Sequence, residues 1–181
     1  MVTWKTVTTM LAVTAVVGLA PAAPLGAQQR TARDGKGPSL SATDYLEIKQ
    51  LVARYAYALD QVEGSGEAFA RLFTADGVFK VKGGGTPDVK GRQKLAAFAR
   101  ADVKNQGPLW VHDFVTNHII QPSPQGATGR VYVVGIEIAE SGNPGVIQTG
   151  GRYEDEYQKT SEGWRIKTRT YVPIKLGPRP E

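Results

Sequence analysis

The most regular hydrophobic pattern in the chain is a helical repeat that runs from residue 43 to residue 60. Apolar side chains recur there at intervals of three and four residues, which places them on one face of a helix. Ser41 or Thr43 can cap the first turn, because a side-chain oxygen there accepts a hydrogen bond from a free backbone N–H group. We therefore expect a helix with one buried stripe, formed by Tyr45, Ile48, Leu51, Val52, Tyr55, Ala58 and Leu59.

The rest of the domain divides into two shorter helices and a series of strands. Helical spacing over 67–73 and 92–103 predicts the second and third helices, and a short strand, 78–81, is expected after the turn at Asp76-Gly77. Beyond residue 109 the repeat changes to two, which predicts four long strands at 110–121, 127–139, 145–159 and 163–173. Helices followed by strands indicate an α+β fold, with three N-terminal helices packed on a curved antiparallel sheet.

Both ends of the chain lie outside this domain, which we expect to span residues 43–174. Residues 1–27 have the order of a signal peptide, with one cation at Lys5, an apolar run and then small residues up to Ala27. The apolar run is too short to cross a membrane as a helix, and an uncleaved anchor is the alternative. We expect cleavage after Ala27, a periplasmic or secreted protein, a flexible leader over 28–42 and a tail over 175–181.

The amino-acid composition limits the kinds of site that the chain can form. A chain of 181 residues is long enough for one domain with a core. It contains no cysteine, which excludes disulfides, thiolate metal sites and cysteine nucleophiles. His112 and His118 are the two histidines, and without an acidic cluster beside them we predict no metal. The net charge of +5 comes from scattered Lys and Arg, so we expect no nucleic-acid partner, and we expect no cofactor because no nucleotide-binding motif is present.

Several segments together resemble the SnoaL-like branch of the nuclear transport factor 2-like superfamily. They are residues 47–60, 69–79, 115–120 and 150–169, with a glycine, Gly91, before the third helix. The branch includes polyketide cyclases, scytalone dehydratase, bile-acid dehydratase, lindane dehydrochlorinase and lignin-dimer formaldehyde lyases. The resemblance implies a cone-shaped α+β barrel, a pocket for a small hydrophobic or aromatic substrate, and self-association as a dimer or trimer. Val131, Val133 and Ile136 would then form either an apolar dimer patch or part of the core.

The resemblance also implies candidate catalytic residues. Asp60 matches the acidic residue of the dehydratase and dehydrochlorinase sites, Tyr55 matches a pocket-facing position on the same helix, and Arg169 matches a basic pocket residue. Family members usually have a histidine four residues before the asparagine that is Asn117 here. That place is Asp113 in this chain, and His112 is its neighbour. The alternatives for Tyr55 and Arg169 are core packing and an exposed strand cation.

Two arrangements of the His112-Asp113 pair are open. A strand bulge would let His112 point into the pocket as the base, polarised by Asp60. Strict alternation instead puts Asp113 on the same face as Asn117, and the resemblance implies that the asparagine faces inward. Asp113 with Asp60 would then form an acid and base pair without a histidine. We expect the substrate to contact Trp110, Phe114, Asn117 and Tyr153, with core packing as the alternative for the aromatic residues at 110 and 114.

These residues suggest three functions. The first is an exported, cofactor-independent lyase that eliminates water or formaldehyde from a small cyclic or aromatic, lignin-derived substrate by proton abstraction. The second is an isomerase or cyclase that uses the same pocket and returns the proton elsewhere. The third is a non-catalytic module for ligand binding or dimerisation.

Overall fold

The helical repeats of the sequence become three helices. The computed structural model describes residues 37–60, 66–85, 87–106, 110–138 and 145–174. The helices are α1 (Ala42–Asp60), α2 (Glu67–Ala70) and α3 (Arg92–Gln106). In this part of the chain no helix is long and apolar enough to cross a membrane. The expected signal peptide, most of the leader and the tail fall outside the described residues.

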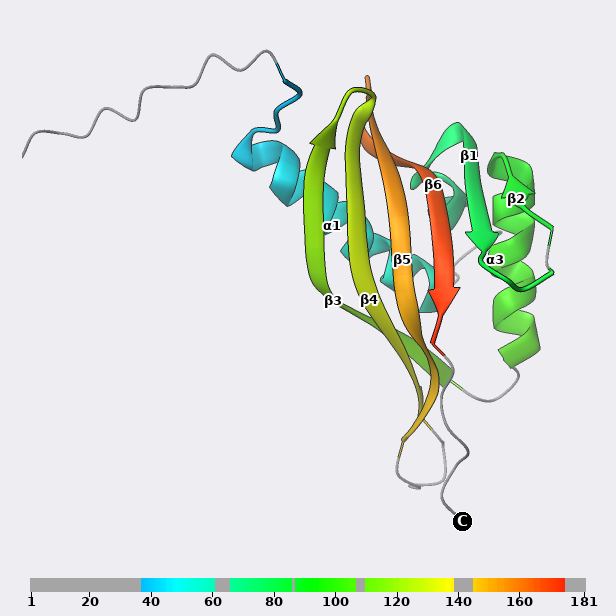
Figure 1. Cartoon of the computed structure of the whole chain (residues 1–181). Coiled ribbons are helices and arrows are strands. Elements are labelled where there is room, and N and C mark those ends of the chain that lie inside the picture. Colours follow the sequence, from blue (N-terminus) through cyan, green and yellow to red (C-terminus); the bar gives the residue numbers. More distant parts are fainter. Residues whose placement is uncertain (1–36, 61–65, 86, 107–109, 139–144, 175–181) are drawn as a thin grey trace, which may run out of the picture. The chain divides into compact units, whose positions relative to one another are not determined.

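The strands form one sheet that confirms the expected α+β class. They are β1 (Phe73–Val81), β2 (Val89–Lys90), β3 (Trp110–Ser123), β4 (Gly126–Ile138), β5 (Val146–Thr160) and β6 (Gly163–Pro173). Their order across the sheet is β2-β1-β6-β5-β4-β3 (Figure 1). The four long strands were expected as an antiparallel meander, and β3 to β6 pair in that way. One pairing differs from the expected antiparallel sheet, because β1 lies parallel to β6.

Strand β1 is longer than the sequence pattern predicts. The dipeptide Asp76-Gly77 was expected as a turn, yet it lies inside the strand, where the register against β6 shifts between Phe73 and Val78. The Asp76 carboxylate accepts hydrogen bonds from the Thr74 hydroxyl at 3.0 Å and from Lys167 Nζ at 2.5 Å. These contacts join the irregular segment to β6, and the turn-forming dipeptide lies in a bulge of β1. Helix α2 ends at Ala70, three residues before the expected end.

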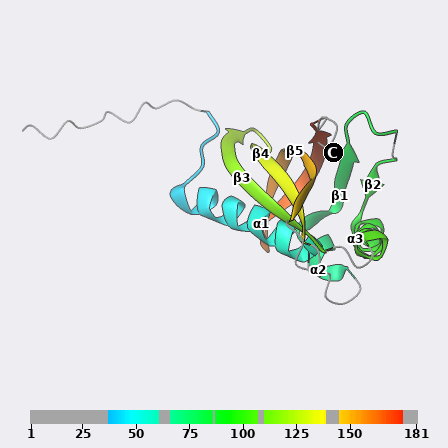
Figure 2. The ribbon, with the colours of Figure 1, turned by 90° about the horizontal axis from the view of Figure 1, so that it is seen from below.

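The core lies between the helices and one face of the sheet. Helix α1 packs against β3 and β6, and α3 packs against β1 and α2 (Figures 1 and 2). Apolar side chains from the three helices and from β1, β4, β5 and β6 form one buried cluster, and Val115 and Ile120 of β3 pack against it. Val131 and Val133 belong to it, each 2% exposed, so these two residues are core and not the apolar dimer patch that was the alternative.

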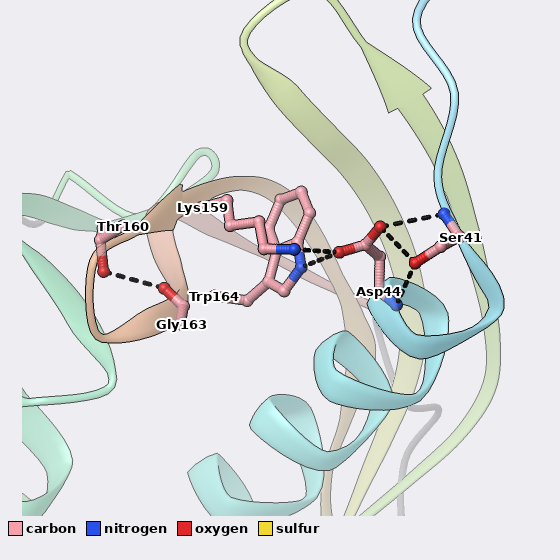
Figure 3. Close-up of polar contacts among 6 residues, drawn as sticks. All are labelled: Ser41, Asp44, Lys159, Thr160, Gly163 and Trp164. Atoms are coloured by element: carbon pink, nitrogen blue, oxygen red, sulfur yellow. Dashed lines mark hydrogen bonds and ion pairs between the residues drawn. The ribbon is translucent and has the colours of Figure 1, made fainter.

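A polar cluster fixes the start of α1 (Figure 3). The Asp44 carboxylate accepts hydrogen bonds from the backbone N–H and the hydroxyl of Ser41, and the Ser41 hydroxyl in turn accepts from the Asp44 N–H. Lys159 Nζ and the Trp164 indole N–H donate to the other oxygen of Asp44, at 2.7 and 2.9 Å. The Asp44 carboxylate therefore joins the N-terminal cap of α1 to the β5–β6 hairpin and fixes this end of the helix against the sheet.

A bulge in β3 decides which of its side chains face the core. Asn117 has a φ of +55°, and the register against β4 shifts between Thr116 and Ile119. Before this point Asp113 and Val115 face inward. After it His118 and Ile120 face inward, because the extra residue reverses the alternation.

Candidate active site

A cavity of about 540 Å³ lies between the C-terminal half of α1, the N-terminal part of β3, α3 and the inner face of the sheet. Five aromatic rings and three carboxylates form much of its wall. Its lining side chains are Tyr55, Leu59, Asp60, Phe79, Val81, Phe98, Asp102, Val111, Asp113, Val133, Gln148, Thr149, Tyr153 and Tyr171. A space of this size and character suits a small, largely apolar molecule with a few polar atoms.

Asp60 ends α1 directly beside β3. Its two carboxylate oxygens accept the backbone N–H of Asp113, at 3.1 and 3.2 Å, and the second oxygen lies 3.3 Å from His112 Nδ1. An ionised Asp60 requires that His112 carries its proton on Nδ1 and donates it. Burial raises the pKa of Asp60, while the Asp113 N–H and His112 oppose the rise. Asp60 therefore ties the helix end to the strand and supplies negative charge beside Asp113.

Of the His112-Asp113 pair, Asp113 faces the cavity. Its carboxylate accepts a hydrogen bond from the Tyr153 hydroxyl at 3.3 Å. Burial, followed by the nearby charge of Asp60, raises the pKa of Asp113 to about 6. His112 lies on the other face of β3 with its side chain 33% exposed, and reaches the site only through Asp60. The bulge that was considered for His112 exists, but it lies at Asn117, too late in the strand to turn His112 inward.

Tyr55 brings a hydroxyl to the buried site. The residue is 1% exposed, its ring packs against Phe69, Phe73 and Tyr153, and it lines the cavity. Its hydroxyl makes no hydrogen bond of normal geometry among the described residues, although the Arg169 guanidinium lies close by. Burial raises the pKa of Tyr55 and Arg169 opposes only part of the rise, so the phenol keeps its proton and can donate it to a ligand oxygen.

Arg169 is completely buried and is not an exposed strand cation. Its side chain is 0% exposed and forms a two-pronged ion pair with Asp155, at 2.8 Å from Nε and 2.7 Å from Nη2. Burial alone would lower the pKa of Arg169, but the Asp155 carboxylate more than offsets this effect and raises it. The guanidinium group lies against the faces of the Tyr55 and Tyr153 rings, and these two rings stand between it and the cavity.

The four residues that were expected to contact the substrate do not all lie at the cavity. Tyr153 lines the cavity and bonds to Asp113. Phe114 and Asn117 do not line this cavity: Phe114 is 54% exposed on the outer face of β3, and Asn117 is exposed at the bulge. The physical reason is the strand alternation for Phe114 and the left-handed backbone for Asn117. The side chain of Trp110 lies outside the described part of the structure.

Three further residues lie near the site that were not among the candidate catalytic or substrate-contacting residues. Asp102 on α3 lines the cavity, and its charge also raises the pKa of Asp113. Asp155 and His118 lie on the inner face, where Asp155 holds Arg169 and His118 approaches Tyr157. The alternation of Tyr153, Asp155 and Tyr157 on one face was the available signal for Asp155. Within the described ranges, no group of three or more His, Asp or Glu residues is arranged to hold a metal ion.

Comparison with known proteins agrees with this architecture. Residues 41–170 match the sequence profile of the SnoaL-like domain family. The uncharacterized protein Rv2910c of Mycobacterium tuberculosis is 28% identical over 127 residues, which are 70% of this chain and 83% of that protein. A solved variant of Rv3472, a protein of unknown function from the same species, is 28% identical with a TM-score of 0.63, over 74% of this chain and 73% of that one. An NTF2-like protein with a cystatin-like fold from Novosphingobium aromaticivorans is 24% identical with a TM-score of 0.61, over 75% of this chain and 84% of that one.

Proposed function

The chain belongs to the SnoaL-like domain family, and from this premise we propose that it is a cofactor-independent lyase acting on a small cyclic or aromatic substrate. The family includes cyclases, isomerases and dehydratases, and its pocket takes small hydrophobic ligands. The observation that supports the proposal is the Asp113 carboxyl, which lines an aromatic cavity and has a pKa of about 6. A group that titrates close to neutral pH is suited to both accept and return a proton.

In the proposed elimination of water, Asp113 begins as a carboxylate and removes a proton from a substrate carbon. Negative charge then develops on a neighbouring substrate oxygen, to which the Tyr55 hydroxyl donates a hydrogen bond. The electron pair of the broken C–H bond forms the new double bond as the hydroxyl group departs. The proton held by Asp113 passes to that hydroxyl, which leaves as water and restores the carboxylate.

The same groups support a retro-aldol route that releases formaldehyde. Asp113 removes the proton of a hydroxymethyl O–H group, the adjacent C–C bond breaks and formaldehyde departs. The electron pair remains on the substrate carbon, stabilised by the hydrogen bond from Tyr55, and that carbon takes up the proton from Asp113. Neither route requires a redox change.

Asp60 acts on this base by charge and position. Because both of its oxygens accept hydrogen bonds from the 112–113 segment, its ionised form is the one held at the end of α1. That charge disfavours the ionised form of Asp113 and adds to the larger effect of burial, and together they raise the pKa of Asp113 to about 6.

Export of the protein is a proposal that rests on the sequence of residues 1–27 alone.

The test is mass spectrometry of the purified chain incubated with hydroxylated steroids, polyketides and lignin-type aromatic dimers. We expect a product lighter by water or formaldehyde, and a loss of turnover of about 10²- to 10⁴-fold in Asp113→Asn. Asp88→Asn is the matched control, because Asp88 is an exposed carboxylate paired only at 3.6 Å with Lys80 among the described residues, and it should keep full turnover.

Two other outcomes would replace the proposal. A product of unchanged mass but altered chromatographic retention would indicate an isomerase or cyclase, in which Asp113 returns the proton to another carbon. Tight binding of a compound by the wild type and Asp113→Asn alike, with no product from either, would indicate a ligand-binding module.

A further inference from the structure

A chain of polar side chains runs behind the cavity wall, from Arg169 to His118. Arg169 donates to both oxygens of Asp155, and Tyr157 donates its hydroxyl proton to Asp155 at 2.5 Å. The Tyr157 oxygen lies 3.1 Å from His118 Nε2. The Tyr157 hydroxyl uses its one proton in the hydrogen bond to Asp155, so its oxygen can only accept a hydrogen bond from His118. His118 must therefore carry a proton on Nε2 and donate it. The direction of every hydrogen bond in this chain is therefore set by the buried ion pair.

The guanidinium group of Arg169 lies against two aromatic rings that are inclined to each other at 68°. Its central carbon lies 3.9 Å from the ring centre of Tyr55 and 4.2 Å from that of Tyr153. Both rings line the cavity, whereas the Arg169 side chain has no exposed surface. A cation this close to a desolvated ring face is strongly attracted to the ring, and it draws electron density away from the phenol oxygen. Both hydroxyl groups become better hydrogen-bond donors as a result.

We propose that Arg169 is a positioning residue that acts on the cavity through the faces of Tyr55 and Tyr153 without touching the substrate, and that Asp155, Tyr157 and His118 hold it there. Tyr55 would pass the effect to the substrate oxygen, and Tyr153 passes it to Asp113 through its hydrogen bond. The inference rests on the proposed function for its kinetic consequence. Its effect on Asp113 exists in the resting protein.

The titration of Asp113 offers a readout that does not depend on turnover. The charged and titratable groups that face it come from α1, α3, β5 and β6, namely Asp60, Tyr55, Asp102, Tyr153, Tyr171 and Arg169. Burial and the carboxylates of Asp60 and Asp102 raise its pKa, while the Tyr153 hydrogen bond and the Arg169 charge lower it. Removal of the cation should therefore raise the pKa of Asp113 further.

The experiment follows the Asp carboxyl carbons by ¹³C NMR across a pH titration, in the wild type and in the double variant Arg169→Met/Asp155→Leu. Replacing a buried ion pair by apolar side chains of similar size is often neutral or stabilising, so this variant is the one most suited to fold. We expect the Asp113 midpoint to rise, because Arg169 lowers the pKa of Asp113 and the simultaneous loss of the Asp155 charge offsets only part of that change. Where a substrate is turned over, kcat should fall about tenfold while KM stays within about twofold.

A second variant should shift the Asp113 midpoint in the opposite direction. Asp155→Asn keeps Arg169 but removes its counter-charge, so the uncompensated cation should lower the Asp113 midpoint. The matched control is Arg152→Met/Glu154→Leu, which removes a second Arg–carboxylate pair from the same strand, with contacts of 2.8 and 3.0 Å, on the partly exposed face. That control should leave both the Asp113 midpoint and kcat unchanged.

An unchanged Asp113 midpoint in the folded double variant, or in Asp155→Asn if only that variant folds, would overturn the proposal. A raised KM with unchanged kcat would also overturn it, because that pattern belongs to a residue that binds the substrate directly. A shifted midpoint in a protein that turns over no member of the substrate panel would support the positioning role and contradict the proposed lyase. The two proposals can therefore fail separately.

Discussion

At the scale of single residues, Tyr55 combines two properties that are in tension. Its ring makes aromatic contacts deep in the core, yet its buried hydroxyl makes no hydrogen bond of normal geometry among the described residues. A buried polar group without a hydrogen bond costs about 1–3 kcal/mol of stability. Phenylalanine would avoid this cost. The Arg169 guanidinium, which lies against the Tyr55 ring and opposes the rise that burial causes in its pKa, is one candidate partner of the hydroxyl, and a bound ligand is the other.

We therefore expect Tyr55→Phe to separate stability from activity. The free energy of unfolding should stay the same or increase by about 1 kcal/mol, since the ring contacts remain. The value of kcat should fall on the order of 10²-fold, because a donor to the developing oxyanion is lost. Urea unfolding and steady-state kinetics measure the two effects. Tyr57→Phe is the control, as Tyr57 lies on the same helix but is 67% exposed and should change neither quantity. Full activity in Tyr55→Phe would remove this residue from the mechanism.

At the scale of elements, irregular strands place the side chains that matter. The hairpin between β5 and β6 pairs Thr160 with Gly163, and counting back with this register would put Thr168 opposite Asp155. A register shift between Glu156 and Tyr157 brings Arg169 there instead. The position of the ion pair behind the cavity is thus a product of one irregularity in the pairing of β5 with β6, where Lys167 of β6 is the extra residue, just as the inward position of His118 is a product of the bulge in β3.

The bulge at Asn117 can be tested directly. A left-handed backbone costs a side chain with a branched Cβ about 1–2 kcal/mol, whereas glycine adopts it freely. We expect Asn117→Val to lower the free energy of unfolding by about that amount and to weaken the His118–Tyr157 contact, and Asn117→Gly to stay close to the wild type. Urea unfolding and the imidazole NMR signals of His118 give the two readouts. Thr116→Val, one residue earlier and outside the positive-φ region, is the control; if it costs as much as Asn117→Val, backbone strain is not the cause.

At the scale of the whole molecule, hydrophobic periodicity was enough for α1, α3 and the four long strands. It failed where the outcome depends on contacts between distant segments. The parallel pairing of β1 with β6 joins residues about 90 positions apart, such as Phe79 and Arg169, and leaves no local signal. Arg169 was expected in the pocket by resemblance, with an exposed strand cation as the alternative. Its pairing with Asp155 was not foreseen, because a sequence pattern does not show that two charges will neutralise each other in the core. The same reason limits what could be predicted of the candidate site: Asp60, Asp113, Tyr55 and Arg169 were named, whereas the hydrogen bonds that join Arg169 to Asp155 and Tyr157 were not.

The stability of the whole molecule should depend on pH through Asp113. Its ordinary pKa of 3.8 describes the unfolded chain, and burial raises the folded-state pKa to about 6. Between these values the folded protein binds a proton more readily than the unfolded chain does. The contribution of Asp113 to the free energy of unfolding is therefore most favourable below pH 3.8 and is lost as the pH rises through about 6. The sign is opposite to that of a salt-bridged carboxylate such as Asp44, whose pKa is lowered by hydrogen bonds from Lys159, Ser41 and Trp164.

The difference in the free energy of unfolding between the wild type and Asp113→Asn isolates the contribution of Asp113 from those of the other carboxylates. Asn at position 113 cannot titrate, so the stability of the wild type relative to Asp113→Asn should decline as the pH rises from about 4 to about 7 and then level off. Urea unfolding at closely spaced pH values measures the difference. Relative to Asp88→Asn, in contrast, the wild type should show no such decline, since Asp88 is an exposed carboxylate. A flat difference between the wild type and Asp113→Asn over this range would mean that Asp113 ionises at an ordinary pKa, and the proposed base would then lack the property that makes it suited to return a proton.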